Sequence, residues 1–268
     1  MRYAVGATLV AVAAASTLAT HDLFLKPFSF FVEPGADARV RVLNGTFTKS
    51  ENAVARNRLR DLSVVTPNGI EHPDTAAWSD VGDTSVLVLR TAAAGTYVVG
   101  ASTLPRGIKL EGKQFNEYLA SDGVPDVLAA RRRAGELDKP SHERYSKHVK
   151  TLLQVGTTRA GRIDTALGYP AELVPLDNPY SLKPGSELRV RALVDGRPVA
   201  NQFVVAGGRT ASGARLVMQN VRSDSAGIAR VALKGAGYWY VKFIHMVPVQ
   251  NDSVNYESKW ATLTFQVR

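Results

Sequence analysis

Short apolar runs separated by turn residues recur along the chain, and this pattern constrains the fold more than any other feature. Between residues 28 and 102 the runs alternate apolar and polar side chains, and turns such as Pro34-Gly35 separate them. Alternation places one face of a strand on a core and the other in solvent. We therefore predict an antiparallel β-sandwich over residues 20–105. Its predicted strands are 38–43, 62–66, 85–90 and 96–101.

The second half of the sequence shows the same pattern and predicts a second sandwich over residues 169–268. Glycine-containing turns such as Asp195-Gly196 supply the backbone freedom that tight reversals require. The predicted strands of this half are 187–194, 202–206, 215–220, 228–233, 238–245 and 259–267.

A repeat with an offset of 150 residues links the two halves. Pro34, Gly35 and the run Arg39-Val40-Arg41 return as Pro184, Gly185 and Arg189-Val190-Arg191. Two explanations remain open at this stage. The halves arose by internal duplication, or a Pro-Gly turn followed by an alternating strand is a common pattern in β-sandwiches.

Helical spacing between the halves predicts a short helical insert and linker over residues 106–168. One predicted helical stretch is interrupted at Gly123-Val124-Pro125, and a second follows Ser141 as N-cap. Arginines 131–133 on the insert favour either an anionic partner or a solvated helix face. The apolar positions of the first stretch are Phe115, Tyr118, Leu119, Val127 and Leu128, and those of the second are Tyr145, Val149, Leu152 and Leu153. The predicted fold class is therefore mainly β, with two immunoglobulin-like or transthyretin-like sandwiches joined by a helical insert.

The N-terminus has the features of an export signal. Arg2 precedes an apolar stretch that ends at Ala19 and is too short and too polar for a membrane span. We predict a signal peptide over residues 1–19, a periplasmic location, and no transmembrane segment after processing. Cleavage after Ala19 or one residue later leaves His21 at or next to the new terminus. Export removes nucleic acid as a partner despite the net charge of +9, and the absence of cysteine excludes disulfides and thiolate chemistry.

Several short motifs resemble those of a known family. They are His21 to Pro27, Phe115 to Leu119, Glu143 to Ser146, Lys150 to Gly156 and Tyr256 to Leu263. Together they resemble "domain of unknown function 4198" over essentially the whole mature chain. The resemblance implies an exported protein, often labelled the periplasmic component of nickel or cobalt uptake. In the second half, Asp195 to Val199, Asp224 to Gly227 and Gly237 to Trp239 resemble the carboxypeptidase-regulatory-like domain, which implies a binding or bracing role.

The candidate site residues are His21, His245, Asp22 and Glu257. A divalent nickel, cobalt, copper or zinc ion without cysteine ligands requires imidazole and carboxylate. A free terminal amine beside His21 would add a further nitrogen ligand. The alternative is that both histidines only make structural hydrogen bonds, since no closely spaced ligand pair supports the metal site.

These residues leave two functions open. The first is a periplasmic binding or accessory protein for a transition metal, partnered by a metal-uptake membrane complex. The second is a non-catalytic structural or interaction module that docks on an envelope protein or glycan. We do not expect an enzyme, because the sequence shows no nucleophile elbow and no phosphate-binding glycine loop. A metal-dependent hydrolase would need an open coordination position beside a cleft.

Overall fold

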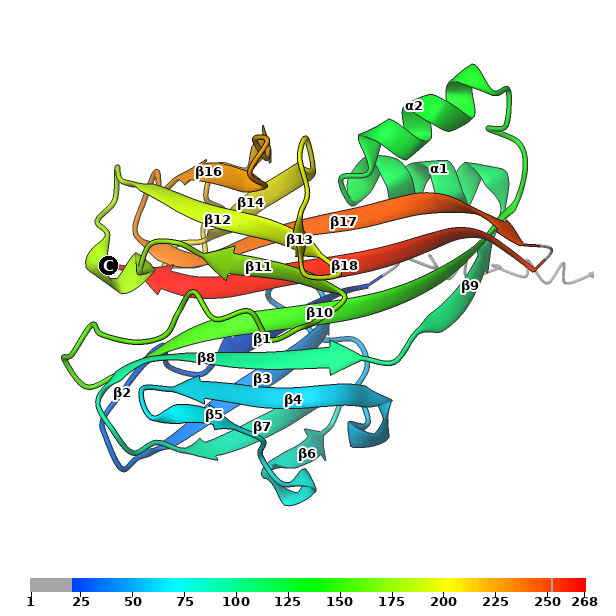
Figure 1. Ribbon diagram of the computed structural model, residues 1–268. Helices are drawn as coiled ribbons and strands as arrows, with labels where there is room; N and C mark the ends of the chain where they lie inside the picture. The colour runs from blue at the N-terminus through cyan, green and yellow to red at the C-terminus, as the bar shows by residue number, and fades with distance from the viewer. Residues whose placement is uncertain (1–20, 252) are drawn as a thin grey trace, which may run out of the picture.

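The protein is built around one large β-sheet. The computed structural model describes residues 21–251 and 253–268, so the predicted signal peptide lies outside the described residues. Among the described residues the main path of this sheet runs β15-β14-β17-β18-β10-β8-β4-β5, with β2 and β9 pairing with β10. Figure 1 shows the long strands β10, β17 and β18 running through the middle of the molecule. The bounds are β2 Phe31–Val32, β4 Leu59–Thr66, β5 Gly69–Glu71, β8 Gly95–Thr103, β9 Arg106–Leu110, β10 Ser141–Val155, β14 Phe203–Arg209, β15 Gln219–Arg222, β17 Gly237–Asn251 and β18 Val254–Val267.

Two small sheets cover this large sheet, one over each half of the chain. In the first the order is β1-β3-β7-β6, and in the second β12 is flanked by β11, β13 and β16. Each traps its own apolar core against the large sheet, around Leu25 and Val99 in the first half and around Leu173 and Val241 in the second. The bounds are β1 Asp22–Pro27, β3 Asp37–Gly45, β6 Trp78–Val81, β7 Thr84–Arg90, β11 Ala171–Pro175, β12 Glu187–Val194, β13 Arg197–Pro198 and β16 Ile228–Ala232.

The two small sheets lie on opposite faces of the large sheet. Val149 of β10 belongs to the first core and pairs in register with Thr262, whereas Leu263 belongs to the second core and pairs with Lys150. Successive side chains of a strand point to opposite faces, so the two cores lie on opposite faces. The mainly β, sandwich-type fold predicted from the sequence is confirmed, but both halves share the same central sheet.

The predicted repeat has a structural counterpart. β3 and β12 follow turns in which Gly35 and Gly185 adopt positive φ angles of 78° and 95°. Over their shared length the two strands have the same burial pattern, and each is the middle strand of its small sheet. The two halves therefore follow one plan, as internal duplication predicts.

Two helices pack against the extended ends of β17 and β18. α1 (Gly112–Ser121) begins with a capping box formed by Glu111 and Gln114, and α2 (Pro125–Arg133) begins at a proline. Phe115 and Tyr118 of α1 pack with Trp260 and Ile244 in a third apolar cluster. The predicted helical stretch around Gly123-Val124-Pro125 is confirmed. None of the helices that the structure describes is long and apolar enough to span a membrane. Short 3₁₀ turns lie at Arg56–Arg58, Thr75–Ala77 and Pro179–Ser181.

The second predicted helical stretch was wrong. Residues 141–155 form β10, which pairs in parallel with β18 and antiparallel with β8 and β9. The spacing of Tyr145, Val149 and Leu152 fits a helix, but β10 is buried on both faces, so its apolar residues do not alternate cleanly. The predicted strand 215–220 was also misplaced, because β15 begins only at Gln219.

Candidate functional site

One face of β1 lies against one face of β17 through three side-chain pairs. The Asp22 carboxylate accepts a hydrogen bond from Lys242 at 2.6 Å. The Phe24 and Tyr240 ring centroids are 5.4 Å apart, and Lys26 Nζ lies 5.3 Å from the centroid of the Tyr238 ring. Residues two apart on a strand share a face, so positions 22, 24 and 26 of β1 form one row and positions 242, 240 and 238 of β17 form the row that faces it. The first row places an acid, an aromatic ring and a base in sequence along β1.

The free edge of β1 is held by two threonines of β18. Thr262 Oγ1 donates to the Leu23 carbonyl at 2.9 Å, and the Thr264 hydroxyl donates to the Leu25 carbonyl. These bonds satisfy carbonyl groups that an edge strand otherwise leaves unpaired. β1 is thereby fixed over the large sheet, with Asp22 directed toward Lys242.

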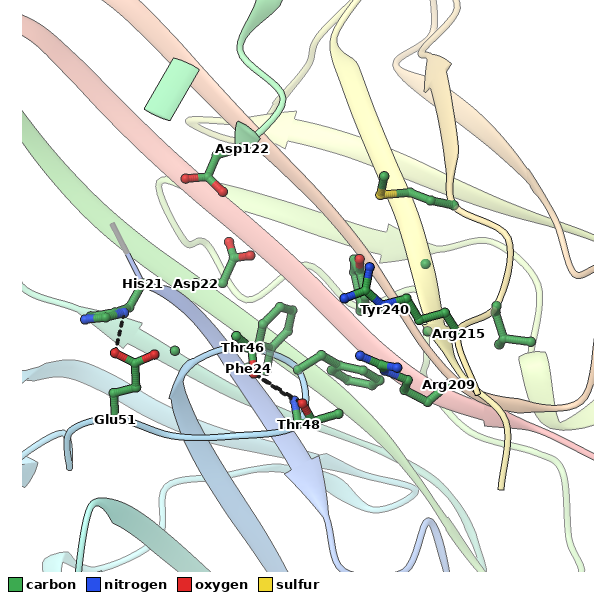
Figure 2. Close-up of a pocket in the computed structure, with 16 residues that line it drawn as sticks. His21, Asp22, Phe24, Thr46, Thr48, Glu51, Asp122, Arg209, Arg215 and Tyr240 are labelled. Atoms are coloured by element: carbon green, nitrogen blue, oxygen red, sulfur yellow. Dashed lines mark hydrogen bonds and ion pairs between the residues drawn. The ribbon is translucent and has the colours of Figure 1, made fainter. Parts of the chain in front are cut away.

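A cavity of about 730 Å³ opens beside this row. Asp22 and Phe24 of β1 contribute to one part of its lining, and Arg209 and Arg215 contribute to another. Figure 2 shows Asp22, Asp122, His21 and Glu51 on one side and the two arginines on the other. The cavity therefore has a wall rich in carboxylate groups and a wall with two guanidinium groups.

The carboxylate wall depends on a tight loop after β3. Gly45 has φ +158°, and a Cβ there would lie 2.6 Å from the Lys49 carbonyl oxygen, so the position favours glycine. The Thr46 hydroxyl accepts from the Lys49 N–H at 3.1 Å, and Gly45 forms a β-bridge with Ser50. The loop ends at Glu51, whose carboxylate lies 3.5 Å from His21 Nδ1.

The guanidinium wall comes from a hairpin after β14. Arg209 and Arg215 pair in an isolated β-bridge, and Arg209 Nη1 donates to the Gly213 carbonyl at 3.1 Å. Gly207 lies directly beneath Tyr240, because a Cβ there would be 2.6 Å from the tyrosine hydroxyl. The absence of a side chain at this position allows the hairpin to lie close to β17.

Buried charged groups lie behind the carboxylate wall. Lys242 also reaches Asp122 at the end of α1, at 3.4 Å. Burial alone lowers the pKa of Lys242, but Asp22 and Asp122 outweigh it and raise that pKa above its usual value. Asp22 Oδ1 is buried and has no hydrogen-bond partner among the described residues. An acceptor of this kind next to a cavity is available to a ligand.

A second lysine lies further inside. Lys147 of β10 is buried, donates to the His21 carbonyl, and lies 4.9 Å from the centroid of the Trp260 ring. Burial lowers its pKa to about 8, although Asp22 and other nearby carboxylates oppose this. Lys147 thus connects the first described residue of the chain to the large sheet.

A buried carboxylate completes the interior of the site. Glu143 accepts hydrogen bonds from Tyr118 at 3.1 Å and from Ser258, and burial raises its pKa. Its Oε2 atom has no hydrogen-bond partner within the described chain. Tyr118, Glu143, Ser258 and Trp260 all lie in the motifs that carry the family resemblance, although none of them was among the predicted site residues.

The structure brings together only two of the four predicted site residues. His21 and Asp22 line the same cavity. His245 lies three positions along β17 from Lys242, so its side chain points to the opposite face of the sheet. Its Nδ1 is 3.0 Å from Gln202 Oε1, and burial lowers its pKa. Glu257 instead forms an ion pair with Arg144 at 2.8 Å.

No group of three or more histidine and acidic residues that could hold a metal ion occurs in the described part of the chain. The residues that sequence analysis did not single out are Glu51, Arg209, Arg215 and Lys242. Lys242 had a visible signal, because it is a charged residue within the otherwise apolar and aromatic run 238–246. Glu51 and Arg215 come from loops and Arg209 from the end of β14, and no local sequence pattern places these three residues together.

The chain matches the sequence model of a known family. The model described as "Domain of unknown function (DUF4198)" matches residues 18–247. No functionally curated protein matches the chain in sequence. Among solved structures, trypsin-activated α2-macroglobulin from Escherichia coli is similar with 12% identity and a TM-score of 0.23. That match covers 92% of this chain, which spans only 15% of the α2-macroglobulin chain.

Proposed function

The chain belongs to the DUF4198 family, and we propose that it is an exported binding protein of the cell envelope. Its ligand is a small molecule that carries both a positive and a negative group, such as an amino acid or a short peptide. The ligand occupies the cavity between β1 and the hairpin after β14. Its positive group lies toward Asp22 and Glu51, and its negative group lies toward Arg209 and Arg215.

The observation that carries this proposal is the opposite charge on two walls of one cavity. A volume of about 730 Å³ falls within the range of about 300–1,000 Å³ typical of small-molecule sites. Phe24 and Tyr240 provide apolar surface between the charged walls. Charged groups on fixed strands favour ligands of complementary charge and orientation.

Export supports the assignment to the envelope. The predicted signal peptide and the absence of cysteine suit a chain that folds in the periplasm without disulfides. In this compartment a binding protein can deliver its ligand to a membrane complex, which is the kind of partner we propose.

A transition metal ion is the second candidate ligand. The observation that favours it is the distance of 3.5 Å from His21 Nδ1 to the Glu51 carboxylate. Processing that leaves His21 at the terminus would add its amine, and imidazole, amine and carboxylate suit nickel, cobalt, copper or zinc. His245 and Glu257 take no part in this version of the site, because His245 faces the other side of the sheet and Glu257 is paired with Arg144.

The test uses the processed full chain, with its N-terminus established by sequencing. Isothermal titration against a panel of amino acids and dipeptides should give saturable one-to-one binding. Glu51→Gln and Arg215→Gln should each weaken that binding at least tenfold, because each removes one charged group from one wall. Glu187→Gln and Arg230→Gln remove an exposed ion pair outside the cavity lining and serve as matched controls. Unchanged affinity in both cavity variants would refute the proposed site.

A parallel titration with nickel, cobalt, copper and zinc tests the second candidate. Binding that is lost in His21→Ala and Glu51→Gln but kept in His245→Ala identifies the metal site at the cavity. Binding that is lost in His245→Ala instead, or absent for all four metals, rejects it.

A further inference from the structure

Two positive side chains stand directly opposite each other next to the cavity. Lys26 of β1 pairs in register with Arg41 of β3. Side chains that oppose each other across an antiparallel pair have Cβ atoms about 4.5–5.5 Å apart, and like charges in this position destabilise a sheet. The protein nevertheless places both charges here, on the face of β1 that also carries Asp22 and Phe24.

A third positive side chain joins them from the other half of the chain. Arg209 is the register partner of Tyr238, and the Tyr238 ring lies under Lys26. Lys26 Nζ also lies 4.3 Å from the centroid of the Phe47 ring, and Arg41 Cζ lies 4.6 Å from that of Phe28. Aromatic faces attract cations and hold them in place without neutralising their charge.

No carboxylate forms an ion pair with any of these three residues in the part of the chain that the structure describes. Lys26 donates to the Phe47 carbonyl at 3.2 Å, and an ammonium group has two further N–H donors. Arg41 Nε is buried and has no hydrogen-bond partner among the residues that the structure describes. Burial, Arg41 and Arg209 together lower the pKa of Lys26 to about 8. The cluster thus has donors that can receive an anion.

We propose that Lys26, Arg41 and Arg209 form an oxyanion site that binds a phosphate or sulfate group. Three positive charges suit a group with two or more negative charges, and arginine forks match the oxygen spacing of such groups. Arg209 also lines the cavity, whereas Lys26 and Arg41 do not, so the oxyanion site adjoins the cavity and shares one arginine with it. The inference goes beyond the proposed cavity ligand and does not depend on it.

The second half of the molecule offers an internal control. Arg191 is the repeat counterpart of Arg41, and its Nε is likewise buried and without a partner among the described residues. The residue opposite Arg191 on β11 is Val174, not a lysine. The oxyanion site therefore belongs to one copy of the repeat, and Arg191→Gln is a matched control for Arg41→Gln.

The experiment titrates the processed full chain with sodium sulfate and with sodium phosphate, at constant ionic strength kept with sodium chloride. We expect saturable one-to-one binding that weakens at least tenfold in Lys26→Met and Arg41→Gln. Lys26→Arg keeps the charge and should retain most of the affinity, and Arg191→Gln should bind like the wild type. Circular dichroism and thermal unfolding identify any variant that fails to fold. Failure of the wild type to bind either anion, or equal loss in Arg191→Gln, would overturn the site.

Sulfate also gives a pH signature, because it stays fully ionised in this range. Lys26 faces Arg41, Arg209 and the Tyr238 ring, and its lowered pKa means that it loses its proton near pH 8 in the free protein. Sulfate affinity should fall as pH rises through about 8, and Lys26→Arg should remove this dependence. A profile for Lys26→Arg that matches the wild type would contradict the role of Lys26.

Two further probes identify the source of the oxyanion. Glycerol 3-phosphate represents a soluble phosphate ester, and phosphatidylglycerol vesicles represent a lipid headgroup. Binding of glycerol 3-phosphate that is sensitive to Lys26→Met supports a soluble ligand, and equally sensitive binding of vesicles supports a lipid. Glu51→Gln should change neither result. Loss of amino-acid binding in Glu51→Gln with sulfate binding intact would show that sulfate binding does not require the carboxylate wall, although the two sites share Arg209.

Discussion

The first strands of the two small sheets make related contacts with the large sheet, but one contact is closed and the other is open. On the closed side, Glu172 of β11 pairs with Lys150 of β10, and both side chains are buried. On the open side, Asp22 of β1 pairs with Lys242 of β17 beside the cavity. A buried acid–lysine pair thus occurs in both halves, in two different surroundings.

Hydrogen bonding explains the difference. Glu172 also accepts from the N–H groups of Leu167 and Tyr169, at 2.8 and 2.9 Å, so both of its oxygens are used. Asp22 has one buried oxygen without a partner among the described residues. A fully bonded pair is a structural element, whereas a pair with an unused acceptor at a cavity can bind a ligand. The same structural plan thus carries a fully bonded pair in one half and a pair with an unused acceptor in the other.

The largest expected effect is a loss of folding stability, and it distinguishes the closed Glu172–Lys150 contact from the open Asp22–Lys242 contact. Glu172→Gln leaves Lys150 buried without a counter-charge and should lower the free energy of unfolding by about 3–5 kcal/mol. Asp22→Asn should cost only about 1–2 kcal/mol, since Lys242 keeps Asp122 as a partner. Urea unfolding of both variants measures the difference.

The double variant Lys150→Met with Glu172→Gln is the control for this experiment. It removes both charges, keeps an amide oxygen that can accept from a backbone N–H group, and should recover most of the stability lost in Glu172→Gln alone. If Asp22→Asn lowers the free energy of unfolding as much as Glu172→Gln or more, the Glu172–Lys150 pair is not the more important of the two for stability. The distinction between a structural and a binding contact would then be wrong.

The sequence was sufficient to predict most strands of both sandwiches. Leu188, Val190 and Ala192 alternate with exposed or half-buried residues in β12, and the predicted range 187–194 matches the strand. β10 could not be predicted in the same way. Glu143, Lys147 and Lys150 are all buried in it, and charged residues at such positions are typical of the exposed face of a helix.

The site was only partly predictable, for a different reason. Asp22 and His21 were found through the motif that follows the signal peptide. Arg209 and Arg215 are about 190 positions away in sequence. They line the same cavity as His21 and Asp22 because β1 crosses β17. Nothing in a local pattern specifies that crossing, because it depends on which face each small sheet covers.

We expect an effect of intermediate size on folding stability when pH is changed, because Lys147 next to the open contact has a lowered pKa. The pKa of Lys147 is about 8 in the folded protein, compared with 10.5 ordinarily. Between these values the unfolded chain holds a proton that the folded chain has released, so the folded state gains stability as pH rises. The stability of the wild type relative to Lys147→Met should therefore increase by up to about 3 kcal/mol from pH 8 to pH 10.5.

Chemical unfolding of both proteins across this pH range provides the measurement. Asp22, Asp122, Glu143 and Lys242 surround Lys147 and are present in both proteins, so much of their own contribution cancels. A difference that stays constant with pH, or falls as pH rises, would show that Lys147 keeps an ordinary pKa.

The smallest effect concerns the anchoring of β1, on which the open contact depends. Thr262→Val keeps the side-chain shape but removes the hydrogen bond to the Leu23 carbonyl, at a cost of about 1 kcal/mol. Hydrogen exchange of the β1 amides should quicken with it, because the strand loses one of its ties to β18. Thr151→Val is the matched control, because both hydrogen bonds of the buried Thr151 hydroxyl are long, at 3.3 and 3.4 Å, and therefore weak. If both variants accelerate exchange in β1 equally, the position of Asp22 does not depend on the threonine tie, and the packing of Leu23 and Leu25 in the first core is what holds it.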